Sequence, residues 1–354
     1  MVLQSNIMRS AQHSGMKKIF FGICLGFLSI ILIVLCSEGL LRRAGKMPLY
    51  INQERKIFWK YDPLLGWRHQ PGQQGLFEKP RAFRTKVSIN SKGLRDQEYS
   101  YARIPGKHRI LVLGDSLTWG FGVEQQEMFS EVLENMSKDV EVINAGVSGY
   151  STDQELLWFK TEGVRYAPDL VILVFCGNDD YMNSLDLVYE TYYKPRFRLD
   201  SQERLILQNV PVPHLSFYNK TKFQLRQYSA LINFLSVEYG SALPGSAGIK
   251  QNLKPFRLTL KIIGEIRKIA DTLPAKFMIV STSKFWMTTE SYADFITALK
   301  ADRFPVIDIE SCKGYFDEQM ELPGDTHWNK TGHRFVAKEI FQFISDKELF
   351  SDVK

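Results

Sequence analysis

The pattern of apolar and polar positions first predicts a membrane segment near the N-terminus. From Ile19 to Ser37 the chain has nineteen consecutive uncharged residues. As a helix rising about 1.5 Å per residue, this segment is about 28 Å long, close to the hydrocarbon thickness of a bilayer. A cleavable signal peptide usually has a shorter apolar region, although Ser37-Glu38-Gly39 is an acceptable cleavage site. We therefore expect a transmembrane signal anchor over residues 19–37 after a short tail of residues 1–18, and cleavage stays open.

Residues 47–107 differ in pattern from both the membrane segment and the rest of the chain. They are rich in turn formers and contain short strand-like runs, such as Thr85–Ile89 before Asn90-Ser-Lys-Gly93. Short alternating runs bounded by turn residues are typical of strands and hairpins. This region is predicted to be a small β-rich extension.

From residue 108 to about residue 350, apolar strand-like runs alternate with helical ones. The expected strands are Arg109–Leu113, Val140–Asn144, Leu170–Phe175, Lys276–Ser281 and Val306–Ile309. The expected helices are Met128–Ser137, Asp153–Tyr166, Leu253–Thr272, Glu290–Lys300 and Lys330–Ser345. Five strands separated by helices predict an α/β domain with a parallel sheet covered on both faces. Residues 180–250 interrupt the alternation as an insertion, with a hairpin over 196–199 and 205–208 and a helix over Thr221–Val237.

Composition and charge exclude several classes of protein. Hydrophobic residues make up 44% and charged residues 24% of the chain, which excludes disorder. The net charge is +6, but residues 1–46 hold six basic residues against one acid, which leaves about +1 for the body. A nucleic-acid-binding protein would have a basic body, so we expect no nucleic-acid partner. The four cysteines and six histidines show neither a disulfide framework nor metal-ligand spacing, so we expect no metal and no cofactor.

Candidate reactive groups follow the predicted strands, whose carboxyl ends are where such sheets gather their ligands. Ser116 comes at a tight strand-to-helix turn that suits a nucleophile, although serine is also a common helix cap. Gly149 follows the second strand, where glycine allows close backbone approach or simply makes a turn. Asn178 follows the third strand and suits an oxyanion donor or an Asx turn. Asp325 and His327 precede the last helix and bring an acid and a base together.

This set of residues resembles the GDSL, or SGNH, hydrolase family, which is named after a Ser, Gly, Asn and His from four sequence blocks. The similarity covers residues 108–345, and Gly114-Asp-Ser-Leu117 is a literal match to the first block. It implies a flavodoxin-like three-layer sandwich with a five-stranded parallel sheet, the SGNH hydrolase fold. By the same resemblance, Ser116 is the nucleophile, His327 the general base and Asp325 its partner. The implied oxyanion hole consists of the Ser116 and Gly149 backbone N–H groups and the Asn178 side chain.

Two positions depart from the family pattern. Cys176 stands where the third block usually has its first glycine, and the fifth block reads Asp-x-His instead of Asp-x-x-His. Asp325 must therefore reach the imidazole from one residue later than usual. Related alginate-type acetylation proteins use a similarly close Asp-x-His pair, which admits acyl-transfer chemistry. His333 is a rival histidine, which we expect to be a packing or surface residue inside the last helix.

The N-terminal segment and the stretches Asp62–Trp67 and Asn90–Arg95 make the chain look like membrane-attached bacterial members of the family. We expect a single-pass inner-membrane protein whose catalytic domain is periplasmic or extracellular. The expected function is that of a serine esterase or deacylase acting on ester-linked acyl or acetyl groups of an envelope glycan or lipid. One alternative is an O-acyltransferase that receives acyl groups from a membrane partner protein. Another is an inactive SGNH-like protein that binds a glycan or a protein.

Overall fold

The computed structural model describes residues 2–48, 53–189, 192–240, 256–283, 287–315 and 319–350. The chain divides into two compact units, of which the first comprises residues 1–51 and 216–247. The second unit comprises residues 52–215 and 248–354. Residues 216–247 lie inside the predicted insertion but group with the N-terminal helix, not with the α/β unit.

The second unit is built on a five-stranded parallel sheet, as predicted. In sheet order its strands are β13 (Val306–Asp308), β12 (Lys276–Thr282), β7 (Leu170–Cys176), β5 (His108–Gly114) and β6 (Val140–Asn144). All neighbouring strands pair in parallel. β7 and β6 are buried along their whole length, because helices cover both faces of a parallel sheet. The strand order is that of a flavodoxin-like fold.

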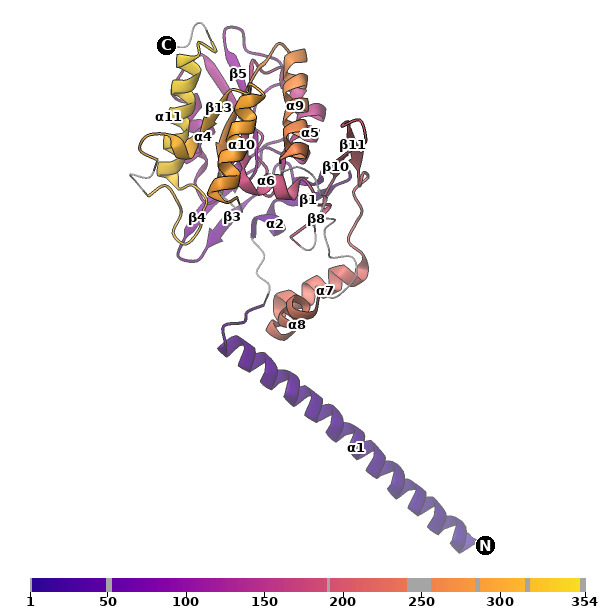
Figure 1. Ribbon diagram of the computed structural model, residues 1–354. Helices are drawn as coiled ribbons and strands as arrows, with labels where there is room; N and C mark the ends of the chain where they lie inside the picture. The colour runs from indigo at the N-terminus through magenta and orange to yellow at the C-terminus, as the bar shows by residue number, and fades with distance from the viewer. Residues whose placement is uncertain are drawn as a thin grey trace. The chain divides into compact units, whose positions relative to one another are not determined.

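Alternate side chains of the strands point into two separate cores. Leu111 and Leu113 of β5 pack in the core that includes residues of α5 (Thr152–Thr161), α9 (Arg257–Thr272) and α10 (Thr289–Ala301). Ile110 and Val112 pack in the opposite core with residues of α4 (Phe129–Glu134) and α11 (Lys330–Asp346). Figure 1 shows α4 and α11 on one side of the sheet and α5 and α9 on the other. The unit is therefore a three-layer sandwich.

The short elements of this unit lie before the sheet and in its connections. Antiparallel hairpins pair β1 (Trp59–Asp62) with β2 (Gly66–His69), β3 (Gln74–Lys79) with β4 (Phe83–Ser88), β8 (Leu187–Val188) with β9 (Tyr192–Tyr193), and β10 (Arg196–Leu199) with β11 (Leu205–Gln208). The short helices are α2 (Gln53–Ile57), α3 (Ser116–Trp119), α6 (Gly177–Met182), η1 (Gln125–Glu127), η2 (Gly163–Tyr166) and η3 (Ile309–Ser311). A third core joins Phe77 of β3 to Trp119 and Phe121, so the β3–β4 hairpin packs beside α3.

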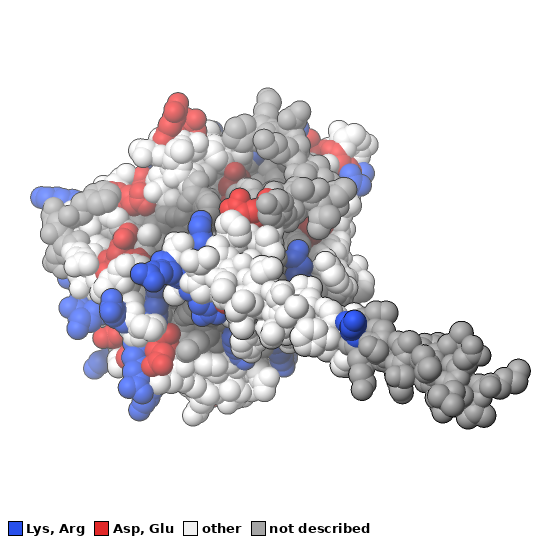
Figure 2. Space-filling view, turned by 90° about the horizontal axis from the view of Figure 1, so that it is seen from below, with Lys and Arg blue, Asp and Glu red and all other residues white. Residues whose placement is uncertain are grey.

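The first unit contains α1 (Val2–Arg43), α7 (Phe217–Tyr228) and α8 (Ala230–Gly240). Its segment Phe20–Arg43 is long and apolar enough to cross a membrane, a property that a signal sequence shares. Figure 2 shows a stretch of uncharged surface on the face of the molecule that is seen from below.

The single helix predicted over Thr221–Val237 is wrong, because the segment forms two helices. Ser229, between α7 and α8, has extended backbone angles of φ −121° and ψ 121°. The Glu38 carboxylate of α1 accepts hydrogen bonds from the backbone N–H groups of Ala230 and Leu231, which begin α8. A side chain distant in sequence therefore caps the second helix, which local pattern does not reveal. Residues 253–255 of another predicted helix lie outside the described residues, and α9 begins at Arg257.

Candidate active site

A chain of hydrogen bonds joins Ser116, His327 and Asp325. The Ser116 hydroxyl oxygen lies 2.8 Å from His327 Nε2, and His327 Nδ1 lies 2.5 Å from Asp325 Oδ1. An ionised carboxylate only accepts hydrogen bonds, so Nδ1 carries the imidazole proton and Nε2 accepts from the serine hydroxyl. The backbone N–H of His327 also donates to Asp325 Oδ1 at 3.0 Å. The Asp-x-His spacing thus lets the carboxylate reach both the ring and the backbone of the same histidine.

The turn that carries Ser116 is fixed by its neighbours. Asp115 caps the short helix α3, its Oδ1 accepting from the Leu117 N–H at 2.9 Å. Gly114 precedes this cap, and a Cβ there would lie 2.1 Å from Thr118 Oγ1. Only glycine therefore fits where β5 turns into α3. The carbonyl of Gly114 accepts from the Val147 N–H at 3.1 Å, which ties the turn to the loop after β6.

Lys79, the last residue of β3, holds the other oxygen of the Asp325 carboxylate. Lys79 Nζ donates to Asp325 Oδ2 at 2.7 Å and to the Gly324 carbonyl at 3.4 Å. Burial of Asp325 opposes its ionisation, but hydrogen bonds and charge from His327, with the hydrogen bond from Lys79, hold the pKa of its carboxyl well below the ordinary value. Asp325 is therefore a fixed anion with both oxygens engaged.

An aromatic ring fixes the plane of the imidazole. The Phe121 ring stacks on His327 with ring centroids 3.9 Å apart and an interplanar angle of 13°. The Phe121 N–H donates to the Ser116 carbonyl at 3.0 Å, so Phe121 contacts both Ser116 and His327. Phe77 and Phe83 of the β3–β4 hairpin pack against Phe121 with centroids 4.8 and 5.4 Å away. This packing restricts rotation of the imidazole away from Ser116.

The residues predicted for an oxyanion hole lie at the same edge of the sheet. Ser116, Gly149 and Asn178 follow β5, β6 and β7, which are adjacent strands. Gly149 has φ +80°, a conformation that favours glycine, and a Cβ there would lie 3.1 Å from the Tyr189 ring. Asn178 is nearly buried, and its Nδ2 lies 3.2 Å from Met182 Sδ. Hydrogen bonds thus join Ser116, His327 and Asp325, whereas Gly149 and Asn178 are related to Ser116 by strand order.

The buried Asp179 side chain stabilises the turn after β7. The Asp179 carboxylate accepts from the Cys176 N–H at 3.2 Å and closes the turn that carries Asn178. Burial raises the pKa of the Asp179 carboxyl, and the nearby Asp115 raises it further. Burial likewise raises the pKa of the Cys176 thiol well above its ordinary value, which disfavours a reactive thiolate. Cys176, which stands where the family usually has a glycine, is therefore a packing residue.

The rival histidine, His333, is part of the core. It is buried in α11, and its Nδ1 accepts a hydrogen bond from the Phe129 N–H at 3.2 Å. Burial lowers its pKa to about 3, so the ring is neutral at physiological pH. This arrangement agrees with the expected packing role. Among the described residues, no group of three or more His, Cys, Asp or Glu side chains is placed to hold a metal ion.

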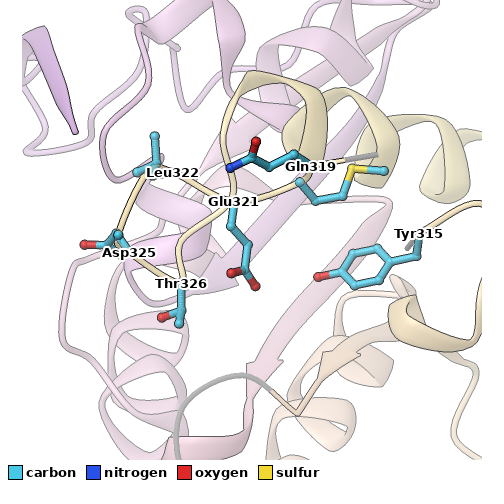
Figure 3. Close-up of a pocket in the computed structure, with 8 residues that line it drawn as sticks. Tyr315, Gln319, Glu321, Leu322, Asp325 and Thr326 are labelled. Atoms are coloured by element: carbon cyan, nitrogen blue, oxygen red, sulfur yellow. The ribbon is translucent and has the colours of Figure 1, made fainter. Parts of the chain in front are cut away.

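A pocket of about 630 Å³ lies beside the acid of the site. Asp325 and Thr326 line it, together with Tyr315, Gln319 and Glu321. Figure 3 shows the Tyr315 ring and the Glu321 side chain directed toward the same space. Met320 and Leu322 add apolar side chains to this lining, and Tyr315 is only 5% exposed, so the pocket combines apolar and polar groups.

Sequence reasoning missed two residues of this site. Lys79 is 246 positions from Asp325, and a lysine at the end of a short strand carries no local signal of such a contact. Phe121 lies five residues after Ser116, in a run of aromatic and glycine residues that suggests only a core. Its closeness to Ser116 in the sequence is the one signal that could have indicated a role for Phe121.

Solved structures similar to the chain include several ester hydrolases. A lipolytic protein of the G-D-S-L family from Desulfitobacterium hafniense has 13% identity and a TM-score of 0.40, covering 67% of this chain and 99% of its own. A two-domain esterase active on acetylated mannans has 15% identity and a TM-score of 0.39, with 70% of this chain and 51% of its own covered. A psychrotrophic esterase from Pseudoalteromonas has 13% identity and a TM-score of 0.39, with 68% and 98% covered.

Family membership rests on the sequence of the α/β unit. No curated protein matches the chain significantly. The model of the GDSL-like lipase/acylhydrolase family matches residues 112–335, which include the strand ends and the Ser116, Asp325 and His327 positions. The match covers more than half of the chain, and the structure adds the parallel sheet and the serine–histidine–aspartate contacts. The chain therefore belongs to the GDSL-like lipase/acylhydrolase family of ester-bond hydrolases.

Proposed function

We propose that this protein is a membrane-anchored serine esterase in which Ser116 is the nucleophile, His327 the general base and Asp325 the acid that orients the base. The observation that carries the proposal is the continuous hydrogen-bond chain from Asp325 through His327 to the Ser116 hydroxyl. A serine hydroxyl is a weak nucleophile unless an adjacent base accepts its proton. A carboxylate at Nδ1 fixes the tautomer that leaves Nε2 free for this task.

The reaction follows from these contacts in two halves. Ser116 Oγ attacks the ester carbonyl carbon while His327 Nε2 accepts the hydroxyl proton. The bond to the alcohol oxygen then breaks, and the same proton passes from Nε2 to the departing alcohol, which leaves an acyl group on Ser116. In the second half, water gives a proton to His327 and attacks the acyl carbon. Collapse of this intermediate releases the acid and returns a proton to Ser116.

We assign the oxyanion hole to the backbone N–H groups of Ser116 and Gly149 and to the Asn178 side chain. Adjacent strands bring all three to one sheet edge, which supports the assignment. The contact between Asn178 Nδ2 and Met182 Sδ is weak, since a thioether is a poor acceptor, so the amide is available to a developing oxyanion. Loss of one such donor typically lowers turnover by about 10²–10³-fold.

The proposed substrate is an acyl or acetyl ester of a cell-envelope glycan. The pocket beside Asp325 supports a ligand with hydroxyl groups such as a sugar, because the polar side chains of Gln319, Glu321 and Thr326 are in its lining. The apolar segment Phe20–Arg43 supports placement at a membrane, where envelope glycans are assembled. In this proposal α1 remains as an anchor and the second unit lies outside the cytoplasm.

An assay with the full chain in detergent tests the reaction. The protein is incubated with p-nitrophenyl acetate, with and without an oligosaccharide acceptor, and acetate and acetylated sugar are both measured. The esterase proposal expects acetate release in both cases and loss of release in Ser116→Ala. Formation of acetylated sugar in place of acetate would show that the reaction is acyl transfer and not hydrolysis. Equal release of acetate by wild type and Ser116→Ala would refute catalysis by the serine.

Reporter fusions at the C-terminus test the proposed location. Alkaline phosphatase folds and is active only outside the bacterial cytoplasm, whereas green fluorescent protein exported through the general pathway stays dark. We expect an active phosphatase fusion and a dark fluorescent fusion. The reverse result would refute the topology and, with it, an envelope substrate.

A further inference from the structure

Helix α7 carries an apolar face that nothing in the described structure covers. The side chains of Phe217, Tyr218, Leu225 and Tyr228 are 85%, 69%, 48% and 78% exposed. At 3.6 residues per turn, these four positions fall within an arc of about 100° on one side of the helix. Large contiguous apolar patches are rare on monomeric soluble proteins and commonly mark interaction surfaces.

Glu38 of α1 fixes the start of α8 and thereby the corner between α7 and α8. Its carboxylate accepts hydrogen bonds from the Ala230 N–H at 2.8 Å, the Leu231 N–H at 2.9 Å and the Ser229 hydroxyl at 2.8 Å. Arg42, one turn further along α1, bonds the same carboxylate at 2.7 Å and the Tyr228 carbonyl at 2.9 Å. The last residue of α7 is therefore held directly against the end of α1.

The position of Glu38 sets the depth of this corner relative to a bilayer. Between Phe20 and Ser37, α1 has 18 uncharged residues, which at about 1.5 Å each span about 27 Å. This length matches the hydrocarbon core of a bilayer, so Glu38 falls where the polar headgroups begin. A charged carboxylate in a helix is tolerated at that level and not inside the hydrocarbon. Its bonds to Ala230 and Leu231 bring the α7–α8 corner to the same level.

The residue types on α7 fit that environment. Tyrosine and tryptophan are enriched where headgroups meet acyl chains, and phenylalanine and leucine form the apolar face of helices that lie in this region. Lysine and arginine attract anionic lipid headgroups. α7 combines the aromatic face with Lys220 and Lys222, and Arg42 and Arg43 end α1 nearby in the same unit. Arg226, on another side of α7, is instead buried and bonded to Asn233 of α8 at 3.0 Å. α7 thus packs within the unit through Arg226 and leaves its aromatic face exposed.

We propose that α7 lies in the plane of the membrane surface and inserts its face of Phe217, Tyr218, Leu225 and Tyr228 into the headgroup region of the bilayer that α1 spans. This inference rests on the proposal that α1 is retained as an anchor. With α1 across the bilayer and α7 in its surface, the first unit has two attachments to the membrane. Together they restrict rotation of this unit about the α1 axis. The partner is a lipid surface, recognised by aromatic insertion and by basic residues.

Photo-crosslinking of the full chain in liposomes tests this contact. The photoreactive residue p-benzoylphenylalanine replaces Phe217 or Tyr228 in separate variants, in liposomes that contain anionic and zwitterionic lipids. Asn219 is the matched control, because it is exposed on the opposite side of the same helix. Leu28 in the apolar part of α1 serves as the reference for lipid contact. Adducts are identified by mass spectrometry after irradiation.

We expect severalfold more lipid adduct from positions 217 and 228 than from position 219, and a reduction of the adduct at 217 in the Glu38→Ala background. Equal adducts at positions 217 and 219, with lipid adduct present at position 28, would overturn the inference and leave the anchor intact. Adducts to protein in place of lipid at 217 and 228 would identify a protein partner and also overturn it. No lipid adduct at position 28 would refute the anchor itself.

Discussion

Replacing Lys79 with alanine tests whether the β3–β4 hairpin belongs to the catalytic apparatus. Lys79 Nζ lies 2.7 Å from Asp325 Oδ2, and the two side chains are 35% and 10% exposed. Solvent screens a pair that is partly exposed on the lysine side, so we take the interaction as about 1 kcal/mol. One kcal/mol corresponds to about fivefold in a rate.

Loss of the Lys79 ammonium group removes the donor that fixes the second oxygen of Asp325. The carboxylate is then less firmly held in the position from which it orients His327. We therefore expect kcat to fall about fivefold in Lys79→Ala, with little change in KM.

The assay is p-nitrophenyl acetate hydrolysis by the full chain in detergent, measured over a range of substrate concentrations. Lys79→Arg should retain most of the wild-type kcat, because it keeps a positively charged donor. Lys86→Ala is the matched control, since Lys86 is an exposed lysine on the same hairpin. A Lys79→Ala protein with the kcat and KM of wild type would refute a positioning role for this lysine.

Three further predictions concern the acid and the pocket. Asp325→Asn should lower kcat by up to about 10⁴-fold, which is the scale of the defect when the imidazole adopts the wrong tautomer. The double variant with His327→Ala should be little slower than His327→Ala alone, because the two residues act as a unit. A folded Asp325→Asn protein with near-normal turnover would contradict the assigned role of Asp325. Because its pKa is depressed on folding, Asp325 stabilises the protein above the unfolded pKa of about 3.9, and this contribution is lost as the pH falls toward the folded value. The Asp325→Asn protein should therefore unfold more easily than wild type at neutral pH in thermal denaturation, and the difference should shrink in strong acid. Glu321→Gln should raise KM for acetylated oligosaccharides and leave hydrolysis of p-nitrophenyl acetate unchanged, and equal effects on both substrates would argue against a sugar subsite.

The sheet was predictable because its strands have a strong local signal. β7 is a run of apolar residues buried along its whole length, which neither a surface strand nor an amphipathic helix would produce. The placement of Ser116, Gly149 and Asn178 after adjacent strands was predictable for a related reason, since parallel strands bring their carboxyl ends to one edge. The sequence therefore predicts that Ser116 and Asn178 lie near one another, although they are 62 positions apart.

Features that depend on contacts between distant segments were not predictable from local pattern. The break at Ser229 requires the Glu38 carboxylate, and without that cap residues 221–237 have the composition of one helix. The ion pair between Lys79 and Asp325 likewise joins a strand of the N-terminal extension to a loop near the C-terminus. Both contacts are made by charged side chains whose partners are set by the tertiary fold, so neither leaves a periodic trace in the sequence.

The central claim is that Ser116 is a nucleophile activated by His327, and covalent labelling with a fluorophosphonate tests it most directly. Such a probe reacts with an activated serine hydroxyl and leaves a stable adduct. We expect the full chain to be labelled, peptide mapping to place the adduct on Ser116, and Ser116→Ala to abolish the labelling. His327→Ala should slow the labelling strongly, because the hydroxyl then lacks its base. Undiminished labelling of the Ser116→Ala protein would contradict the claim.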